Sequence, residues 1–440
     1  MKLIDYFRLF KAVLIFTVNA VLSQLTPVQE AISLQVPSSA YVHIPFCRRR
    51  CYYCDFPVSV VGDRAHGDTS GTISQYVKAL CREIAATKVL GQPLKTVFFG
   101  GGTPSLLSVN QLVQILEALN QQFGIGANAE ISLEMDPATF TLDQLRGYRE
   151  AGVNRVSLGV QAFQPELLQV CGRSHTESDV WAAVEVIRQV GVPDFSLDLI
   201  SGLPHQTLEQ WQATLEAAMA IAPTHISIYD LTIEPVTAFG RYYRPGVYPL
   251  PTDDTTAKMY RQGRQVLTAA GYEHYEISNY AQPGHQCRHN RVYWENRTYY
   301  GFGMGATSYS QGQRFTRPRK TREYYQWVKE YEVADGRLDC PQPLLDEVLL
   351  ETLMLGLRLQ EGVNLSALAQ LHGKEMLTQI WACLRLYHQQ GWVEIVGTDA
   401  EPMPYAQKLP STARQLRLTD PEGFLFSNTV LAALFASLEK

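Results

Sequence analysis

The chain is organised around one stretch, Tyr41-Val-His-Ile-Pro-Phe-Cys47-Arg-Arg-Arg-Cys51-Tyr-Tyr-Cys54-Asp-Phe56. An apolar, strand-like run ends at a proline and leads into three cysteines with the spacing C-x3-C-x2-C. Three thiolates this close in sequence can hold one metal centre through a single loop, and they leave a fourth ligand position open. Structural zinc sites usually fill all four positions, whereas a four-iron cluster on three thiolates keeps one iron open for another ligand. The spacing therefore favours a 4Fe-4S cluster on Cys47, Cys51 and Cys54.

Two further features of this loop bear on the metal. Arg48, Arg49 and Arg50 stand between the first two cysteines, where positive charge would lower the pKa of the thiols and favour thiolates. The alternative is a zinc loop completed by His43 or His66, although zinc loops usually pair their cysteines as C-x2-C.

The composition describes an ordinary globular protein in a reducing compartment. The 440 residues make two domains the natural expectation, and 46% hydrophobic residues supply ample core material. The net charge of -5 and the lack of a long basic run give no reason to expect nucleic acid as a partner. Eight cysteines are too few for a disulfide scaffold at this length, and three of them share one loop.

The first residues resemble a secretory signal. Residues 1–23 carry three basic side chains and then an apolar run over 12–22 that is too short to span a bilayer comfortably. Export would carry an oxygen-sensitive cluster into an oxidising space. We therefore expect residues 1–35 to be an extension outside the folded core, produced by a coding start set too far upstream. A true membrane-targeting segment is the alternative.

From Tyr41 onward, short β-rich runs alternate with longer amphipathic stretches, which predicts βα units and a parallel sheet. The predicted strands are 41–44, 96–99, 131–134, 155–159, 195–200 and 225–230. The predicted helices are 73–87, 108–121, 142–151, 178–190 and 207–221, and Ser108, Thr141 and Thr207 provide start signals. Six such units are fewer than the eight of a closed barrel. We therefore expect an open, partial (β/α)6 barrel over residues 36–270.

Polar residues gather where these strands end. Glycines 100–102 follow the second strand, and their backbone could approach a ligand and donate N–H groups. Glu134 ends the third strand, Gln161 follows the fourth, and Asp198 lies in the fifth. Each has an ordinary alternative as a turn or cap residue. However, the carboxyl ends of barrel strands share one rim, where active sites are built, so we expect a site there.

The cysteine spacing, with an aromatic residue before the last cysteine, resembles the signature of radical S-adenosylmethionine (SAM) proteins. The chain from Tyr41 onward resembles their oxygen-independent coproporphyrinogen III oxidase family. That resemblance rests on Gly-Gly-Thr-Pro at 101–104, Arg-Val-Ser-Leu-Gly-Val-Gln at 155–161, Cys-Gly-Arg-Ser-His-Thr at 171–176 and Leu-Asp-Leu-Ile-Ser-Gly-Leu-Pro at 197–204. It implies that SAM occupies the open iron and contacts Tyr41, Tyr53, Gly101, Gly102, Thr103, Glu134, Gln161, Arg173 and Asp198. A guanidinium suits a carboxylate, and the Asp198 carboxylate suits a ribose hydroxyl or an amino group.

Two departures point away from oxidase activity. Phe56 stands two residues after the third cysteine, where the oxidases of this family carry a further cysteine. The residues before Tyr41 also differ from the extended N-terminal segment of the oxidases.

A second motif lies past the barrel. His289-Asn290-Arg-Val-Tyr293-Trp294 resembles the heme-binding motif of the HemW heme chaperones, and Glu-Ile-Ser-Asn-Tyr-Ala at 276–281 precedes it. An imidazole can ligate iron, and Tyr and Trp offer flat faces to a porphyrin. A structural histidine with two core aromatic residues is the alternative. Cys287 is another candidate partner for iron or a vinyl group, although the C-x-x-C-H pattern of covalent attachment is absent.

The C-terminal part predicts a separate small module. Residues 341–440 resemble the α+β, mostly helical C-terminal domain of the same family, and residues 271–340, with the heme motif, would be a segment associated with the barrel. We expect helices over 349–359, 376–387 and 426–438, and a hairpin of 392–396 with 413–418.

The resemblance implies a heme chaperone that binds heme, a 4Fe-4S cluster and SAM. It would pass heme to acceptor hemoproteins, with respiratory ones as candidates, from the cytoplasm or the membrane periphery. The rival interpretation is an enzyme of porphyrin biosynthesis, the oxygen-independent coproporphyrinogen III oxidase. A third is a radical SAM enzyme with another substrate. No residue is assigned a catalytic role.

Overall fold

The computed structural model describes residues 35–63, 66–337 and 344–438. The expectations for the signal-like run and for the extension up to residue 34 therefore lie outside the described residues. No helix within the described ranges is both long and apolar enough to cross a membrane.

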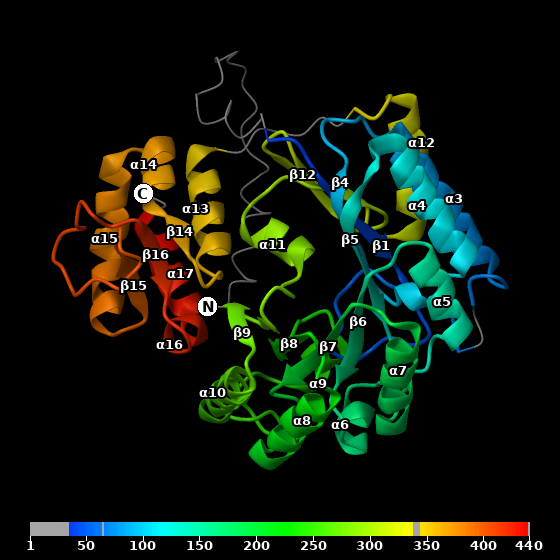
Figure 1. Cartoon of the computed structure of the whole chain (residues 1–440), viewed down its shortest axis with the longest axis horizontal. Helices are drawn as coiled ribbons and strands as arrows, with labels where there is room; N and C mark the ends of the chain where they lie inside the picture. The colour runs from blue at the N-terminus through cyan, green and yellow to red at the C-terminus, as the bar shows by residue number, and fades with distance from the viewer. Residues whose placement is uncertain (1–34, 64–65, 338–343, 439–440) are drawn as a thin grey trace.

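A sheet of mostly parallel strands forms the centre of the molecule (Figure 1). Over the described residues it has nine strands in the order β11-β1-β4-β5-β6-β7-β8-β10-β9. The end strands β11 (Tyr300–Phe302) and β9 (Glu273–Glu276) leave the sheet open. Six neighbouring parallel strands coincide with the predicted ones, namely β1 (Ser39–Ile44), β4 (Leu94–Gly101), β5 (Ile125–Met135), β6 (Arg155–Gln161), β7 (Asp194–Ser201) and β8 (His225–Asp230). The open, partial barrel is therefore confirmed.

Helices cover the outer face of this sheet (Figure 1). They are α3 (Gly71–Ala86), α4 (Val109–Phe123), α5 (Leu142–Glu150), α7 (Glu177–Val190) and α8 (Leu208–Ile221). Ser108, Thr176 and Thr207 begin three of them with capping boxes, in which side chain and backbone satisfy each other's free groups. Alternate strand residues such as Val156 and Leu158 are fully buried in the main hydrophobic core. Because successive strand residues point to opposite faces, the other residues face the concave side.

The chain between β8 and the C-terminal module supplies the strands at both edges of the sheet. Strand β10 (Asn279–Ala281) pairs with β8 and β9, and β11 pairs with β1. Helix α11 (Arg288–Trp294), which carries the predicted heme motif, lies on the concave side of the sheet (Figure 1). The sequence did not predict strands β9, β10 and β11. The other elements of residues 35–337 are β2 (Phe46–Cys47), β3 (Ser59–Val60), a 3-10 turn (Pro104–Leu106), α6 (Pro165–Val170), α9 (Ala238–Tyr242), α10 (Asp253–Ala269), β12 (Thr307–Ser310), β13 (Gln313–Thr316) and α12 (Thr321–Val333).

The C-terminal module has a hydrophobic core of its own, around Leu353, Trp381 and Leu384. The predicted hairpin is confirmed, because β15 (Val393–Val396) and β16 (Gln415–Leu418) pair antiparallel, and β14 (Val363–Asn364) adds a third strand. Its helices are α13 (Leu345–Gly356), α14 (Leu365–His372), α15 (Lys374–Gln389), α16 (Glu422–Leu425) and α17 (Ser427–Leu438). The module lies beside β9 and α10 (Figure 1), where Arg261 pairs with Glu422.

Candidate functional site

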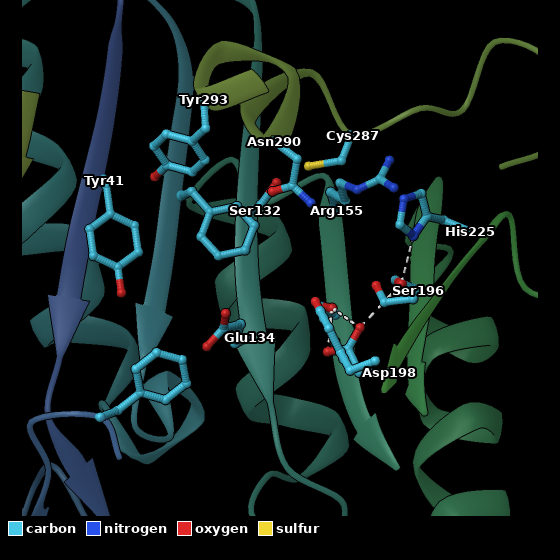
Figure 2. A pocket seen from close by; sticks show the side chains of 15 residues that line it. Tyr41, Ser132, Glu134, Arg155, Ser196, Asp198, His225, Cys287, Asn290 and Tyr293 are labelled. Atoms are coloured by element: carbon cyan, nitrogen blue, oxygen red, sulfur yellow. Dashed lines mark hydrogen bonds between the residues drawn. The ribbon is translucent and has the colours of Figure 1, made fainter. Parts of the chain in front are cut away.

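The concave face of the sheet encloses a polar cavity of about 300 Å³. Figure 2 shows it with the strands running toward their arrowheads, so that Glu134 and Asp198 lie nearer the carboxyl ends than Arg155 does. The cavity lining comes from all six parallel strands β1, β4, β5, β6, β7 and β8, from the cysteine loop, and from α11 with the residue before it. It consists of Tyr41, Phe56, Phe98, Ser132, Glu134, Arg155, Ser157, Ser196, Asp198, His225, Ser227, Tyr229, Cys287, Asn290 and Tyr293.

The cysteine loop lies at the carboxyl end of the barrel. Cys47, Cys51 and Cys54 are free and partly buried, and the loop is held where Tyr52 N donates to Cys171 O at 3.0 Å. Among the described residues, no three His, Cys, Asp or Glu side chains converge as they would on a single ion. A cluster does not require such convergence, because its thiolates bind different irons. The donor set of three free thiols on one loop therefore fits a cluster.

The structure bears on two expectations for the cysteine loop, namely zinc binding by His43 and the effect of the loop arginines on the thiols. Both ring nitrogens of His43 are already engaged, Nδ1 with Tyr41 Oη and Nε2 with Pro57 O, each at 3.0 Å, which counts against His43 as a zinc ligand. The loop arginines mostly bind elsewhere, since Arg49 pairs with Asp63 and Arg50 donates to Phe56 O. Arg50 lowers the pKa of Cys54, but burial outweighs it and raises that pKa to about 11.

The guanidinium that touches a cluster cysteine is Arg173. Its Nη1 lies 3.5 Å from Cys51 Sγ, and its Nη2 pairs with Asp136 and donates to Gly159 O at 2.6 Å. Thr103 Oγ1 donates to the same Asp136 carboxylate at 3.2 Å. Asp136 thus links two predicted SAM residues to the cysteine loop. It was not among the predicted site residues, although it directly follows β5 in the segment Glu134-Met135-Asp136.

The glycine loop is built differently from the prediction. The N–H groups of Gly101, Gly102 and Thr103 donate to Glu134 Oε2, Ile44 O and Phe46 O at 2.9, 2.9 and 2.7 Å, so they are not free for a ligand. Gly101 has φ +114°, and a Cβ there would lie 2.3 Å from the His43 ring. The expectation of free N–H donors is therefore wrong, because the protein uses these groups to join three strand ends.

Two carboxyl groups face the middle of the cavity. Asp198 accepts from Ser157 Oγ at 2.8 Å and also from Ser196 and Ser227. Burial raises the pKa of Asp198 despite these hydroxyls, and burial raises the pKa of Glu134 to about 8. A carboxyl group with such a pKa exists largely in its protonated form near neutral pH and can donate as well as accept a hydrogen bond.

Of the remaining predicted SAM residues, Tyr53 and Gln161 lie at the carboxyl end of the barrel, whereas Tyr41 is level with Arg155 in the register of the sheet. Tyr41 lines the cavity, and Tyr53 packs near Phe239 with ring centroids 6.4 Å apart. Gln161 ends β6 with φ +68°, a conformation uncommon for a residue with a side chain. The structure thus brings Tyr41, Glu134 and Asp198 onto one cavity, whereas Tyr53 and Gln161 lie outside its lining.

The heme motif lies at the end of the cavity remote from the strand carboxyl ends (Figure 2). Asn290 and Tyr293 line the cavity, whereas Trp294 stacks outside it, with the Arg358 guanidinium 5.5 Å from its ring centroid. His289 is fully buried, and this burial lowers the pKa of its ring to about 3. Its Nδ1 bonds Thr96 Oγ1 at 2.7 Å, and its Nε2 bonds Tyr293 Oη at 2.9 Å. Iron ligation by His289 would therefore require the ring to leave these partners.

Several lining residues were missed by the sequence interpretation. Arg155, Ser157, Ser196, His225 and Ser227 stand at every second position of β6, β7 and β8. Polar side chains with period two inside otherwise apolar strands predict a polar inner face, and this signal could have identified them. Glu130 was also missed, since it shows its role only in the fold, where it accepts from the first N–H groups of α11.

Comparisons with known proteins agree with this architecture. The radical SAM superfamily profile matches residues 41–218, and the HemN C-terminal domain profile matches residues 344–399. The curated protein "Heme chaperone HemW" of Synechocystis sp. is 49% identical over 411 residues, covering 92% of this chain and 98% of that relative. The heme chaperone HemW of Escherichia coli is 42% identical over 65% of this chain and 74% of its own length.

A solved structure supports the same fold. Coproporphyrinogen III oxidase (HemN) from Escherichia coli aligns over 97% of this chain and 98% of its own, with a TM-score of 0.75 at 23% identity. This likeness concerns the fold alone, whereas the sequence relatives above define the family. The chain therefore belongs to the HemW family of the radical SAM superfamily.

Proposed function

We propose that the protein is a heme chaperone, which binds heme, holds a 4Fe-4S cluster and SAM, and transfers heme to acceptor hemoproteins. The relatives that define its family carry the name heme chaperone. We place it in the cytoplasm, with respiratory hemoproteins at the membrane as candidate acceptors. The division of the chain into a barrel over 36–270, a heme segment over 271–340 and a C-terminal domain over 341–440 is part of this proposal.

One observation carries the proposal. A single cavity is lined both by three residues predicted to hold SAM, Tyr41, Glu134 and Asp198, and by Asn290 and Tyr293 of the predicted heme motif. The two predicted sites therefore share one cavity.

The residues of the chain have separate tasks in this account. Cys47, Cys51 and Cys54 would hold the cluster, while Arg173 and Asp136 orient the loop beside it. When bound, the cluster supplies one-electron chemistry to SAM. Phe56 is 56% exposed and also lines the cavity, so it offers a flat apolar face where the oxidases of the family carry a further cysteine.

The test is a heme titration of anaerobically reconstituted protein, followed by Soret absorbance. We expect a band that saturates at a fixed ratio of heme to protein in the wild type and weakens in Asn290→Ala, with His372→Ala in the C-terminal module as the control. Cluster content, measured from iron and sulfide, is expected to be equal in all three. Absence of specific heme binding, together with decarboxylation of coproporphyrinogen III, would replace the chaperone by the oxidase.

A further inference from the structure

Arg155 is a buried cation with an unused donor. It is the first residue of β6 and is only 4% exposed. Its Nη1 donates to His285 O at 3.1 Å, whereas its Nη2 is buried and has no hydrogen-bond partner in the described part of the chain. Burying a charged donor without a partner is costly. The side chain lines the cavity, so a ligand could satisfy this donor.

A second unused group stands beside it. Ser132 of β5 is paired in register with Arg155 of β6, so that both side chains project from the concave face next to each other. The Ser132 Oγ is also buried and without a partner among the described residues. Both groups line the cavity at the end where Asn290 of α11 lies (Figure 2). Two adjacent buried donors without partners on one wall of the cavity form a polar site that a ligand with acceptor oxygens can satisfy.

The acidic groups around Arg155 are already used by other partners. Glu130 accepts from the N–H groups of Arg288 and His289, both at 2.9 Å, and thereby caps α11. Asp194 pairs with His285. Burial acts to lower the pKa of Arg155, but Cys287, Glu130, Tyr275 and Asp194 together raise it, so the guanidinium keeps its charge while its Nη2 remains without a partner among the described residues.

We propose that Arg155 and Ser132 bind the carboxylate of a heme propionate, which makes this end of the cavity the carboxylate-recognition subsite of the heme site. The inference rests on the proposed function and adds to it the part of heme that is recognised. A guanidinium and a neighbouring hydroxyl match a carboxylate in charge and geometry. A cavity of about 300 Å³ is at the lower end of the range for small-molecule sites, so it suits a propionate arm rather than the macrocycle.

The position of the buried cation favours one end of the cavity for a carboxylate. Arg155 lies at the α11 end of the cavity, whereas the carboxyl groups of Glu134 and Asp198 lie toward the carboxyl ends of the strands and offer no positive charge to a carboxylate (Figure 2). The propionate would therefore approach past Asn290 and Tyr293, which belong to the predicted heme motif. Tyr293 also lines a second cavity, of about 270 Å³, formed with Phe56, Pro57 and Tyr299.

The experiment varies the ligand first and then the protein. Cluster-reconstituted protein is titrated with iron protoporphyrin IX and with its dimethyl ester, which keeps the macrocycle but lacks both carboxylates. We expect the wild type to bind heme roughly tenfold or more tightly than the ester, the effect of one charge-assisted hydrogen bond. This comparison does not depend on whether any variant folds.

The protein arm uses Arg155→Gln, Arg155→Lys and the control Arg146→Gln, an exposed arginine on the outer helix α5. We expect Arg155→Gln to weaken heme binding to the level of the ester and to leave ester binding unchanged, with Arg155→Lys in between. Equal affinity of the wild type for heme and ester, or equal weakening of both ligands by Arg155→Gln, would overturn the inference and leave the chaperone function standing. Absence of specific heme binding in the wild type would instead overturn the proposed function.

Discussion

Replacing His289 by alanine is expected to lower the free energy of unfolding by about 2–4 kcal/mol, because the ring is a buried structural element. Its removal leaves a hole beside Phe98, whose ring centroid lies 5.3 Å away. It also deprives two hydroxyls, Thr96 Oγ1 and Tyr293 Oη, of their partner. The cavity and the two lost hydrogen bonds act in the same direction.

The same ring predicts a dependence on pH. Burial lowers the pKa of His289 to about 3, whereas the unfolded chain has an ordinary histidine pKa of about 6.5. Since the unfolded state binds the proton more tightly, this contribution to stability is complete above about pH 6.5 and is lost as the pH falls toward 3. At pH 5 the loss amounts to about 2 kcal/mol. His289→Gln cannot titrate and should lack this share of the pH dependence.

The assay is urea unfolding of the cluster-free protein at pH 7 and pH 5, followed by circular dichroism. It compares the wild type with His289→Ala, His289→Gln and the control His388→Gln on α15. An unchanged urea midpoint for His289→Ala would refute the structural reasoning. A His289→Gln protein of normal stability that loses heme would show that the ring leaves Thr96 and Tyr293 to ligate iron.

Three other substitutions probe the core, the rim and the cavity. Glu83→Gln should lower the free energy of unfolding by about 3–5 kcal/mol, because Glu83 is fully buried and pairs with Arg317 at 2.7 Å; an unchanged thermal midpoint would contradict this. Gly101→Ala should destabilise by at least about 2 kcal/mol, since the left-handed φ and the contact with the His43 ring both oppose a Cβ, and a protein that unfolds like the wild type would argue against that geometry. Asp198→Asn should weaken SAM binding roughly tenfold in a calorimetric titration while it leaves the fold intact, and unchanged SAM affinity would remove Asp198 from the proposed site.

The sequence alone predicted the six parallel strands of the barrel but not the short strands at the edges of the sheet. The six parallel strands were found because each has a run of apolar residues followed by an amphipathic helix. Strands β9, β10 and β11 have three or four residues, too few for a periodic pattern. Their positions depend on pairing with β8 and β1, which are distant in sequence. The predicted domain boundaries at residues 35, 270 and 340 stay predictions.

The sequence predicted several residues that the structure places on one cavity, but it did not predict which residues they contact. Arg173 lies 122 residues from Cys51 in the chain, so no local pattern could show that it, rather than the loop arginines, touches that thiol. The glycine loop was correctly placed at a strand end, but its N–H groups turned out to serve the protein. Arg155 was quoted only as part of a motif, because its missing hydrogen-bond partner is visible only in three dimensions.

Direct transfer of heme is the measurement that bears most closely on the proposed function. Heme-loaded, cluster-reconstituted protein would be mixed with the apo form of a b-type cytochrome, and the Soret spectra of both proteins would be followed over time. We predict that heme passes to the cytochrome when the two proteins can touch, and that a dialysis membrane between them prevents it. Retention of heme by the protein in free contact with the acceptor, or equal transfer across the membrane, would contradict the chaperone function.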